Sequence, residues 1–275
     1  MKKLILIFLL IPVIGFSQGK LNQAKNNLSS KSKSKSESSS SKSESSSSGG
    51  SSGSSKVDFN VGRAFVQVFL YAPKIVLGGV YLTAFGDFER RHFSPYPYYY
   101  GNVQGEYDFG LETEDKKSLI GAGVNYLSGD YINSAEANVN YRFLPFLGVD
   151  LSHQSFFEEG LNGSDRLDVT SLIVNYYRLR ERSFTGWWGM GATYVGNEVN
   201  TYGFTYNIGL EVYPVKPMSF LVSYKQSFIN QSHINVTKYQ TKYHRKKMAY
   251  YIGYHDISIA GVKASGMVLG VEASF

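Results

Sequence analysis

The sequence predicts an all-β fold: an antiparallel up-and-down transmembrane β-barrel of about ten strands, with eight or twelve strands as alternatives. Three observations predict it. From about Ser118 onward, apolar and polar residues alternate with a period of two, as in strands whose two faces meet different surroundings. Turn-forming sequences separate these segments at regular intervals. Aromatic residues make up 15% of the chain and charged residues only 18%, which suits amphipathic strands better than long charged helices.

Residues 1–17 have the three parts of a secretory signal peptide. Lys2 and Lys3 form the positive start, an apolar run covers 4–14, and small residues then allow cleavage before Gln18. As a helix, the apolar run is about 16 Å long, which is too short for a hydrocarbon core about 30 Å thick. We therefore expect this segment to direct export and to be removed.

The composition excludes several kinds of chemistry. The chain has no cysteine, so disulfides, thiolate nucleophiles and lipid modification of an N-terminal cysteine are impossible. The formal net charge is +6, but two of the positive charges lie in the predicted signal peptide. The most basic cluster, residues 242–247, has the composition of a charged turn between strands rather than of a nucleic-acid surface. We expect no nucleic-acid partner and no cofactor.

Residues 18–56 are predicted to form a disordered, Ser-rich tether. Of the 27 residues from Ser29 to Ser55, 18 are serine and none is apolar, so ordering them would bury no apolar surface. A flexible chain of this length has an end-to-end distance of roughly 30 Å. We expect the tether to lie in the periplasm, where it would be able to reach other envelope proteins.

Residues 57–100 are the least regular part of the sequence. The stretch 65–85 is rich in apolar residues, but Pro73 and a pair of glycines argue against one long helix. We expect one or two short amphipathic helices on the periplasmic side or in the mouth of the barrel, with extra strands as the alternative. The prolines of Pro95–Gly101 favour extended backbone leading into the barrel, which we expect to occupy 101–275.

Ten strands are predicted in the barrel region. Their ranges are 118–128, 131–143, 146–157, 166–179, 184–196, 201–213, 218–229, 232–244, 247–257 and 263–275. Counting back from a last strand that ends in the periplasm, the short turns at 144–145, 214–217 and 245–246 fall on the periplasmic side. The longer connections at 158–165 and 197–200 fall outside. Short turns on one side and longer loops on the other are typical of outer-membrane barrels.

The alternation assigns one face of each strand to lipid and the other to the barrel interior. Ile208 and Leu210 lie on the apolar face of their strand, whereas Glu211 lies on the opposite face. A Lys or Arg that faces lipid at mid-membrane would cost about 2–4 kcal/mol, which directs Arg142 and Lys225 inward. The side chains expected to face the interior are Glu136, Asn140, Arg142, Asp150, Gln154, Glu211, Lys225, Lys238, Lys242 and Glu272.

A soluble barrel, with its apolar face inside, is the alternative to a membrane-spanning one. Two observations oppose it: the predicted signal peptide, and aromatic residues near the strand ends, where the interface girdles of membrane barrels lie. These aromatic residues are Tyr126, Tyr141, Phe143, Phe156, Phe157, Tyr176, Tyr177, Trp187, Trp188 and Tyr213.

The segment Gly266–Phe275 resembles the terminal strand of bacterial outer-membrane β-barrels. Its alternating apolar residues, which end on an aromatic side chain, are Met267, Leu269, Val271, Ala273 and Phe275. The resemblance implies that these residues are a membrane-insertion signal and that the barrel-insertion machinery is a partner. Residues 57–275 as a whole resemble an uncharacterised family of outer-membrane β-barrel proteins, which implies residence in the lipid bilayer of the outer membrane. No catalytic or ligand residues carry over from that family.

The histidines are the starting point for any catalytic site. His255 and Asp256 are adjacent, but neighbouring residues on a strand point to opposite faces, so they cannot form a dyad. His153 falls on the apolar face near the outer rim, and His244 falls on the inner face at the periplasmic end. The sequence connects no Ser, His and acid triple and no His pair with metal-ligand spacing. We therefore expect a non-enzymatic protein without catalytic, cofactor-binding or metal-binding residues.

The predicted function is that of an integral, porin-like outer-membrane protein, acting as a narrow pore or as a structural or adhesive barrel. Ten strands lie nearer to the eight whose interior is filled by side chains than to the sixteen of an aqueous channel. Two alternatives stay open: an outer-membrane hydrolase of lipase or protease type with a site at the extracellular rim, and a subunit of a larger envelope complex.

Overall fold

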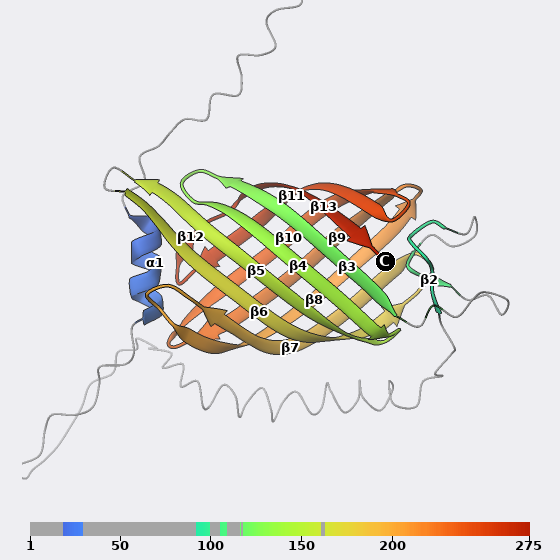
Figure 1. Cartoon of the computed structure of the whole chain (residues 1–275), viewed down its shortest axis with the longest axis horizontal. Coiled ribbons are helices and arrows are strands. Elements are labelled where there is room, and N and C mark those ends of the chain that lie inside the picture. The colour runs from blue at the N-terminus through green and yellow to red at the C-terminus, as the bar shows by residue number, and fades with distance from the viewer. Residues whose placement is uncertain (1–18, 30–91, 100–104, 109–115, 117, 161–162) are drawn as a thin grey trace, which may run out of the picture. The chain divides into compact units, whose positions relative to one another are not determined.

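Ten long antiparallel strands close into a β-barrel (Figure 1), which confirms the predicted fold class. The computed structural model describes residues 19–29, 92–99, 105–108, 116, 118–160 and 163–275. The barrel strands are β3 (Leu119–Gly129), β4 (Asn133–Leu144), β5 (Leu147–Gly160), β6 (Gly163–Arg180), β7 (Phe184–Val195), β8 (Thr201–Val215), β9 (Met218–Ile229), β10 (Ser232–Arg245), β11 (Met248–Ile259) and β13 (Gly266–Ser274). Neighbours along the chain pair with one another, and β13 pairs with β3 to close the barrel.

The strand boundaries lie close to the predicted ones, with two differences. The connection predicted at 158–165 is mostly strand, because β5 and β6 continue to pair as far as Gly160 and Gly163. The last predicted strand is divided into β12 (Val262–Lys263) and β13. The division lies at Ser265, whose hydroxyl accepts a hydrogen bond from the Ile257 backbone N–H and donates one to the Asp256 carboxylate.

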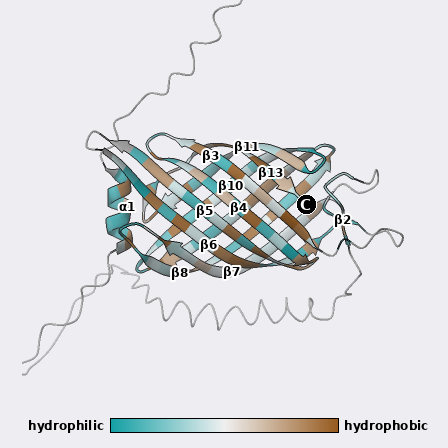
Figure 2. Cartoon of the chain, viewed as in Figure 1, coloured by the Kyte–Doolittle hydropathy of each residue, from teal (hydrophilic) through white to brown (hydrophobic). Residues whose placement is uncertain are grey.

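The wall of the barrel is apolar on its outer face and polar on its inner face. Ile208 and Leu210 are 56% and 40% exposed on the outside, whereas Thr205 and Glu211 of the same strand are buried inside. Figure 2 shows this alternation as changes of hydropathy along the strands. A soluble barrel would have the opposite arrangement, with Ile208 and Leu210 in its core.

The two mouths of the barrel are covered by different elements. Helix α1 (Lys20–Ser29) contacts β5, β6, β10 and β12 at one end of the barrel. Strands β1 (His92–Phe93) and β2 (Tyr107–Asp108) pair with each other at the other end, where Phe275 also lies (Figure 1). We call the first end the helix-covered mouth and the second the C-terminal mouth.

Helix α1 forms within the segment that we expected to be a disordered tether, so the expectation of disorder is wrong for Lys20–Ser29. Leu21, Ala24 and Leu28 recur at helical spacing, and all three are fully buried against side chains of the barrel. The Ser-rich run that follows has no such apolar residues. Residues 30–56 and the predicted signal peptide lie outside the described residues.

Only the last part of the segment 57–100, for which we expected short helices, is described. Residues 92–99 form strand β1 and turns, not a helix. Phe93 packs on Tyr107 with ring centroids 5.5 Å apart, and both side chains are buried with Leu119. Within the described residues, no helix is long and apolar enough to cross a membrane.

Candidate functional site: the barrel interior

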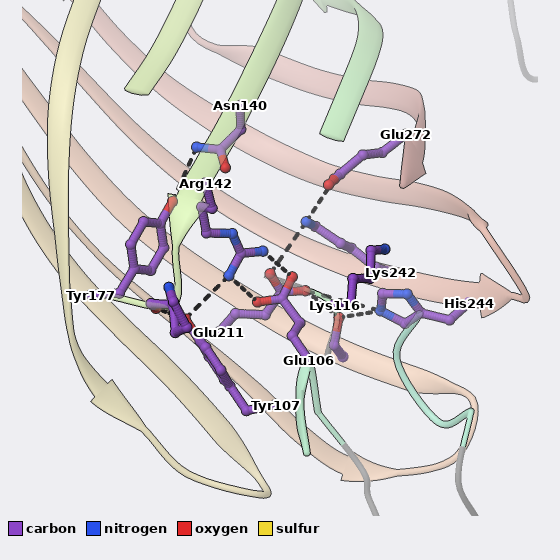
Figure 3. Close-up of polar contacts among 12 residues, drawn as sticks. Glu106, Tyr107, Lys116, Asn140, Arg142, Tyr177, Glu211, Lys242, His244 and Glu272 are labelled. Atoms are coloured by element: carbon purple, nitrogen blue, oxygen red, sulfur yellow. Dashed lines mark hydrogen bonds and ion pairs between the residues drawn. The ribbon is translucent and has the colours of Figure 1, made fainter. Parts of the chain in front are cut away.

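The C-terminal mouth holds a buried ion pair between the barrel wall and the segment 105–108. The Arg142 guanidinium donates two hydrogen bonds to the Glu106 carboxylate, at 2.7 and 2.6 Å, and Figure 3 shows the two groups facing one another. The guanidinium also lies 4.8 Å from the ring centroid of Tyr177. A bidentate pair of this kind fixes both position and orientation. It therefore holds Glu106, which comes from outside the wall, in the mouth of the barrel.

A second group of charges lies beside this pair. The Lys242 ammonium is 2.9 Å from Glu272 and 3.4 Å from Glu211. Glu211 also accepts a hydrogen bond from Ser219, and the Ser219 hydroxyl is 2.7 Å from the His244 ring. Four strands, β8, β9, β10 and β13, contribute these residues (Figure 3). One ammonium thus faces two carboxylates, and each full charge in this group has an opposite charge within salt-bridge distance.

The residues that enter this mouth from outside the barrel strands have shifted pKa values. Burial disfavours the charged form of Glu106, but Arg142 outweighs burial and holds the pKa of the Glu106 carboxyl below its ordinary value. Burial raises the pKa of Tyr107 to about 12. Burial, helped by the nearby Glu211 charge, raises the pKa of Tyr98 to about 12. At neutral pH the two phenols are therefore uncharged and Glu106 is charged.

The Glu106–Arg142 pair predicts that acid loosens the C-terminal mouth. Because the pKa of Glu106 is lowered by folding, its contribution to stability is present above the ordinary glutamate pKa of about 4.3 and is lost as the pH falls through the lower folded value. We expect hydrogen exchange of the amides of 105–108 to accelerate below about pH 4 relative to those of β9. Glu106→Gln should accelerate this exchange at pH 7 and remove the acid dependence. An unchanged acid dependence in that variant would assign it to another group.

Further inside, Glu136 and Lys238 form a second buried ion pair. The Lys238 ammonium donates to both Glu136 carboxylate oxygens at 2.7 Å. Asn125 donates to the same carboxylate at 3.0 Å. Lys225 also points inward and donates to the Ser171 hydroxyl at 3.3 Å. Charges from several strands thus meet across the interior instead of lining an open path.

A cluster of hydroxyl groups lies next to Lys225. Ser171, Thr193, Thr205 and Ser227 come from four neighbouring strands, β6 to β9, and each is at most 1% exposed. Their oxygens are linked by hydrogen bonds of 2.6–3.0 Å. Because these hydroxyls satisfy one another, this part of the interior is filled without charge.

Apolar side chains fill the end of the interior beneath α1. They come from nearly every barrel strand and form one buried cluster with Leu21, Ala24 and Leu28 of the helix. The barrel members are Leu127, Ile132, Phe156, Leu167, Val169, Val195, Val199, Ile229, Ile234, Val236, Ile257, Ile259, Val262, Ala264 and Val268. This cluster separates the charged interior from the helix-covered mouth.

The barrel satisfies the backbone groups at both ends of α1. The Glu158 carboxylate accepts hydrogen bonds from the backbone N–H groups of Lys20 and Leu21, at 3.1 and 2.6 Å. At the other end, Asn230 donates to the Leu28 carbonyl at 2.6 Å. A carboxylate at the N-terminus also complements the helix dipole. The helix is thus fastened through polar groups as well as through its apolar face.

One lysine of α1 is also paired with the barrel. Lys25 lies on the buried face of the helix, is 4% exposed, and forms ion pairs with Asp165 and with Glu198. A buried lysine at this position requires such partners, because an unpaired charge would be costly to bury. The pairing therefore helps to select the seated position of α1.

The structure places the residues predicted to face the interior in the groups described above. Asn140 donates to the Tyr177 hydroxyl at 3.0 Å, Gln154 donates to Ser134 at 3.0 Å, and Asp150 is partly buried. Sequence reasoning missed Glu106 and Glu158, because their partners are distant in the chain. The spacing of Leu21, Ala24 and Leu28 is the signal that would have indicated α1.

The histidines occupy different surroundings. His255 is fully buried in the interior, 2.9 Å from the Gln240 amide, and does not meet Asp256, which is exposed on the outer face. His153 is on the outer face, where the structure brings it together with Ser155 and Asp168, a combination that the sequence did not connect. In the described part of the chain, no group of three or more His, Asp or Glu is placed to hold a metal ion.

Comparisons with known proteins give only weak likenesses to solved structures. No protein-family model and no curated protein matches the sequence. Among solved structures, the chain is similar to the Yersinia pestis outer-membrane protein Ail, with 15% identity, 58% of this chain and 99% of that chain covered, and a TM-score of 0.33. It is also similar to OprG from Pseudomonas aeruginosa, with 13% identity, 58% of this chain and 96% of that chain covered, and a TM-score of 0.32. For the KdgM porin the identity is 12%, the coverage is 56% of this chain and 99% of that chain, and the TM-score is 0.34. All three TM-scores are below 0.5, so these likenesses carry no argument about this chain.

Proposed function

We propose that this chain is an integral protein of the bacterial outer membrane whose barrel is sealed, serving as a structural or adhesive barrel rather than as a diffusion pore. The observation that carries the proposal is the inverted barrel, with apolar side chains outside and paired charges inside. Apolar residues such as Leu269, which is 64% exposed, cover the outer face, where only lipid would bury them. Among the described residues, irregular backbone lies at the barrel mouths, and the wall between them consists of strands whose backbone groups pair with those of their neighbours.

Three features of the interior support the sealed state. The C-terminal mouth is filled by the Glu106–Arg142 pair and its neighbours. The middle is crossed by the Glu136–Lys238 pair and the hydroxyl cluster. The apolar cluster beneath α1 lies at the other end. Ions would have to separate paired charges and also enter an apolar layer, and both steps are unfavourable.

Electrical recordings in planar bilayers test this proposal. We expect the purified full chain to insert without producing stable conductance steps, whereas a porin in the same bilayer does produce them. Insertion is checked separately, by protection of the barrel strands from protease. Stable steps from the inserted chain would contradict the sealed interior. A chain that stays dissolved without detergent and does not insert would contradict the membrane location as well.

The proposed location in the outer membrane implies partners. The barrel-insertion machinery stays a predicted partner. Two residues of the predicted insertion signal, Met267 and Leu269, are 55% and 64% exposed on the outer face of β13. We propose the C-terminal mouth as the periplasmic one, because the short turns were predicted there and the insertion signal ends there. Contacts of the Ser-rich segment with other envelope proteins likewise stay a prediction.

A further inference from the structure

A histidine, a serine and an aspartate lie together on the outer wall of the barrel. His153 and Ser155 are two residues apart on β5 and therefore share its outer face. Asp168 is the direct partner of Ser155 on β6. The Ser155 Oγ is 3.4 Å from the His153 Nε2 and donates a hydrogen bond of 2.6 Å to the Asp168 carboxylate. A hydroxyl is thus placed beside both a base and a carboxylate.

Two further side chains orient this group. Thr170, the partner of His153 on β6, has its hydroxyl 2.9 Å from the His153 Nδ1. When Nδ1–H donates to Thr170, the Nε2 is unprotonated and faces Ser155. The Arg166 guanidinium lies 3.1 Å from the Ser155 Oγ and 2.9 Å from Asp168. It supplies a positive charge where an oxyanion would form beside the serine.

An apolar groove of about 400 Å³ on the same outer wall includes His153 in its lining. Small residues, including Ala122, Ala137 and Ala273, form part of its lining, and Val139 is among the larger ones. Ala137 is the direct partner of His153 on β4, so the groove and the polar group adjoin. Its volume lies in the range of small-molecule sites, and on a wall that faces lipid its natural occupant is an acyl chain.

The polar group lies on a wall whose other exposed side chains are largely apolar. Polar side chains on a lipid-facing surface are unfavourable, least so near the interfaces. Phe157, two residues beyond Ser155 on the same face, packs on Tyr126 with ring centroids 6.0 Å apart. Aromatic residues of this kind mark the interface, the depth at which lipid ester bonds lie. The group therefore lies where a lipid ester would meet it.

We propose that Ser155 and His153 form a site that hydrolyses acyl ester bonds of membrane lipids, with the acyl chain held in the groove. This departs from the non-enzymatic protein predicted from the sequence. It gives residues and a substrate class to the outer-membrane hydrolase that was left open as an alternative. It rests on the proposed membrane location, but not on the sealed interior.

The proposed reaction has two steps, acylation of Ser155 and hydrolysis of the acyl-serine. In the first, the Ser155 hydroxyl turns from Asp168 to His153, and its Oγ bonds to the acyl carbon while its proton passes to the His153 Nε2. Arg166 stabilises the oxyanion. The ester C–O bond then breaks, and the leaving alcohol takes the proton from His153. In the second step, His153 removes a proton from water, whose oxygen attacks the acyl carbon. The fatty acid leaves, and Ser155 recovers its proton.

Release of fatty acid tests the proposal directly. The full chain in mixed micelles of detergent and phosphatidylcholine should release fatty acid, and Ser155→Ala and His153→Asn should each reduce the rate by about 100-fold or more. Ser128→Ala, an exposed serine on the outer face of β3, is the matched control and should keep the wild-type rate. Folding of every variant is checked by protease protection of the barrel. A folded wild-type chain without release, or a folded Ser155→Ala variant with full release, overturns the proposal.

Covalent labelling supplies a readout that does not depend on turnover. A fluorophosphonate should add the mass of one phosphonyl group to the peptide that contains Ser155. His153→Asn should slow this labelling strongly, because the serine is then no longer activated by a base. If the wild-type chain is not labelled, or if His153→Asn is labelled at the wild-type rate, the polar group has only a structural role and the proposal is overturned.

The groove is tested by filling it. Ala137→Phe should lower the rate with long-chain phosphatidylcholine at least about tenfold, while hydrolysis of a short acetyl ester, which needs no groove, stays near the wild-type rate. Equal loss with both esters would overturn the assignment of the groove to the acyl chain. None of these results depends on conductance, so failure here and failure of the sealed-barrel proposal are distinguishable.

Discussion

Replacing Lys238 by methionine should lower the free energy of unfolding by about 3–5 kcal/mol, the largest effect that we expect from a single substitution. The change leaves the Glu136 carboxylate buried without its cation, and the amide of Asn125 does not replace that charge. Urea unfolding from lipid vesicles, followed by the fluorescence of Trp187 and Trp188, measures the effect.

Two control variants separate loss of the ion pair from other causes. Glu136→Gln combined with Lys238→Met removes both charges and should recover most of the stability, since it leaves no unpaired ion. Lys263→Met, at an exposed position, should change the free energy of unfolding by no more than about 0.5 kcal/mol. If Lys238→Met alone is as stable as the wild type, the expected cost of an unpaired, buried Glu136 carboxylate is contradicted.

Replacing Leu28 by alanine should release α1 from the barrel. Leu28 is fully buried in the apolar cluster, and truncation of such a side chain costs about 2–5 kcal/mol. Hydrogen exchange of the α1 amides should therefore accelerate by about 30-fold or more, while that of the central β9 amides changes little. Gln23→Ala changes an exposed position of the same helix and is the matched control. Equal exchange in both variants would mean that α1 is not held by its apolar face.

The barrel strands could be predicted because charged side chains are costly in lipid and apolar side chains are favourable there, so both effects fix which face of a strand points outward. Arg142 and Lys225 cannot face lipid cheaply, while Ile208 and Leu210 gain from doing so, and a slip by one residue would reverse all of them. Strand β9 consequently occupies the predicted residues, 218–229. A small polar residue such as Ser265 is subject to neither effect, and the division between β12 and β13 at this residue was not predicted.

Helix α1 could not be predicted in the same way. A ten-residue helix with three apolar positions is marginal by itself, and it forms here because the barrel buries those positions and Glu158 caps its first turn. These contacts join residues more than 130 positions apart in the chain. The spacing of Leu21, Ala24 and Leu28 permits a helix, but no local pattern encodes these contacts, so the composition favoured a tether.

The candidate sites were only partly predictable for a related reason. The sequence shows that His153 and Ser155 share a face, but it does not show that Asp168 lies beside Ser155. That neighbour is set by the register of β5 on β6. The pair formed by Glu106 and Arg142 depends likewise on how a segment outside the barrel enters the mouth.

The position of α1 has a consequence for the sidedness of the molecule. An even number of barrel strands leaves Leu119 and Phe275 at the same mouth, yet Ser29 lies at the opposite one. With the C-terminal mouth toward the periplasm, as proposed above, Ser29 would lie on the outer side of the membrane, opposite to the periplasmic side expected for the start of the serine run.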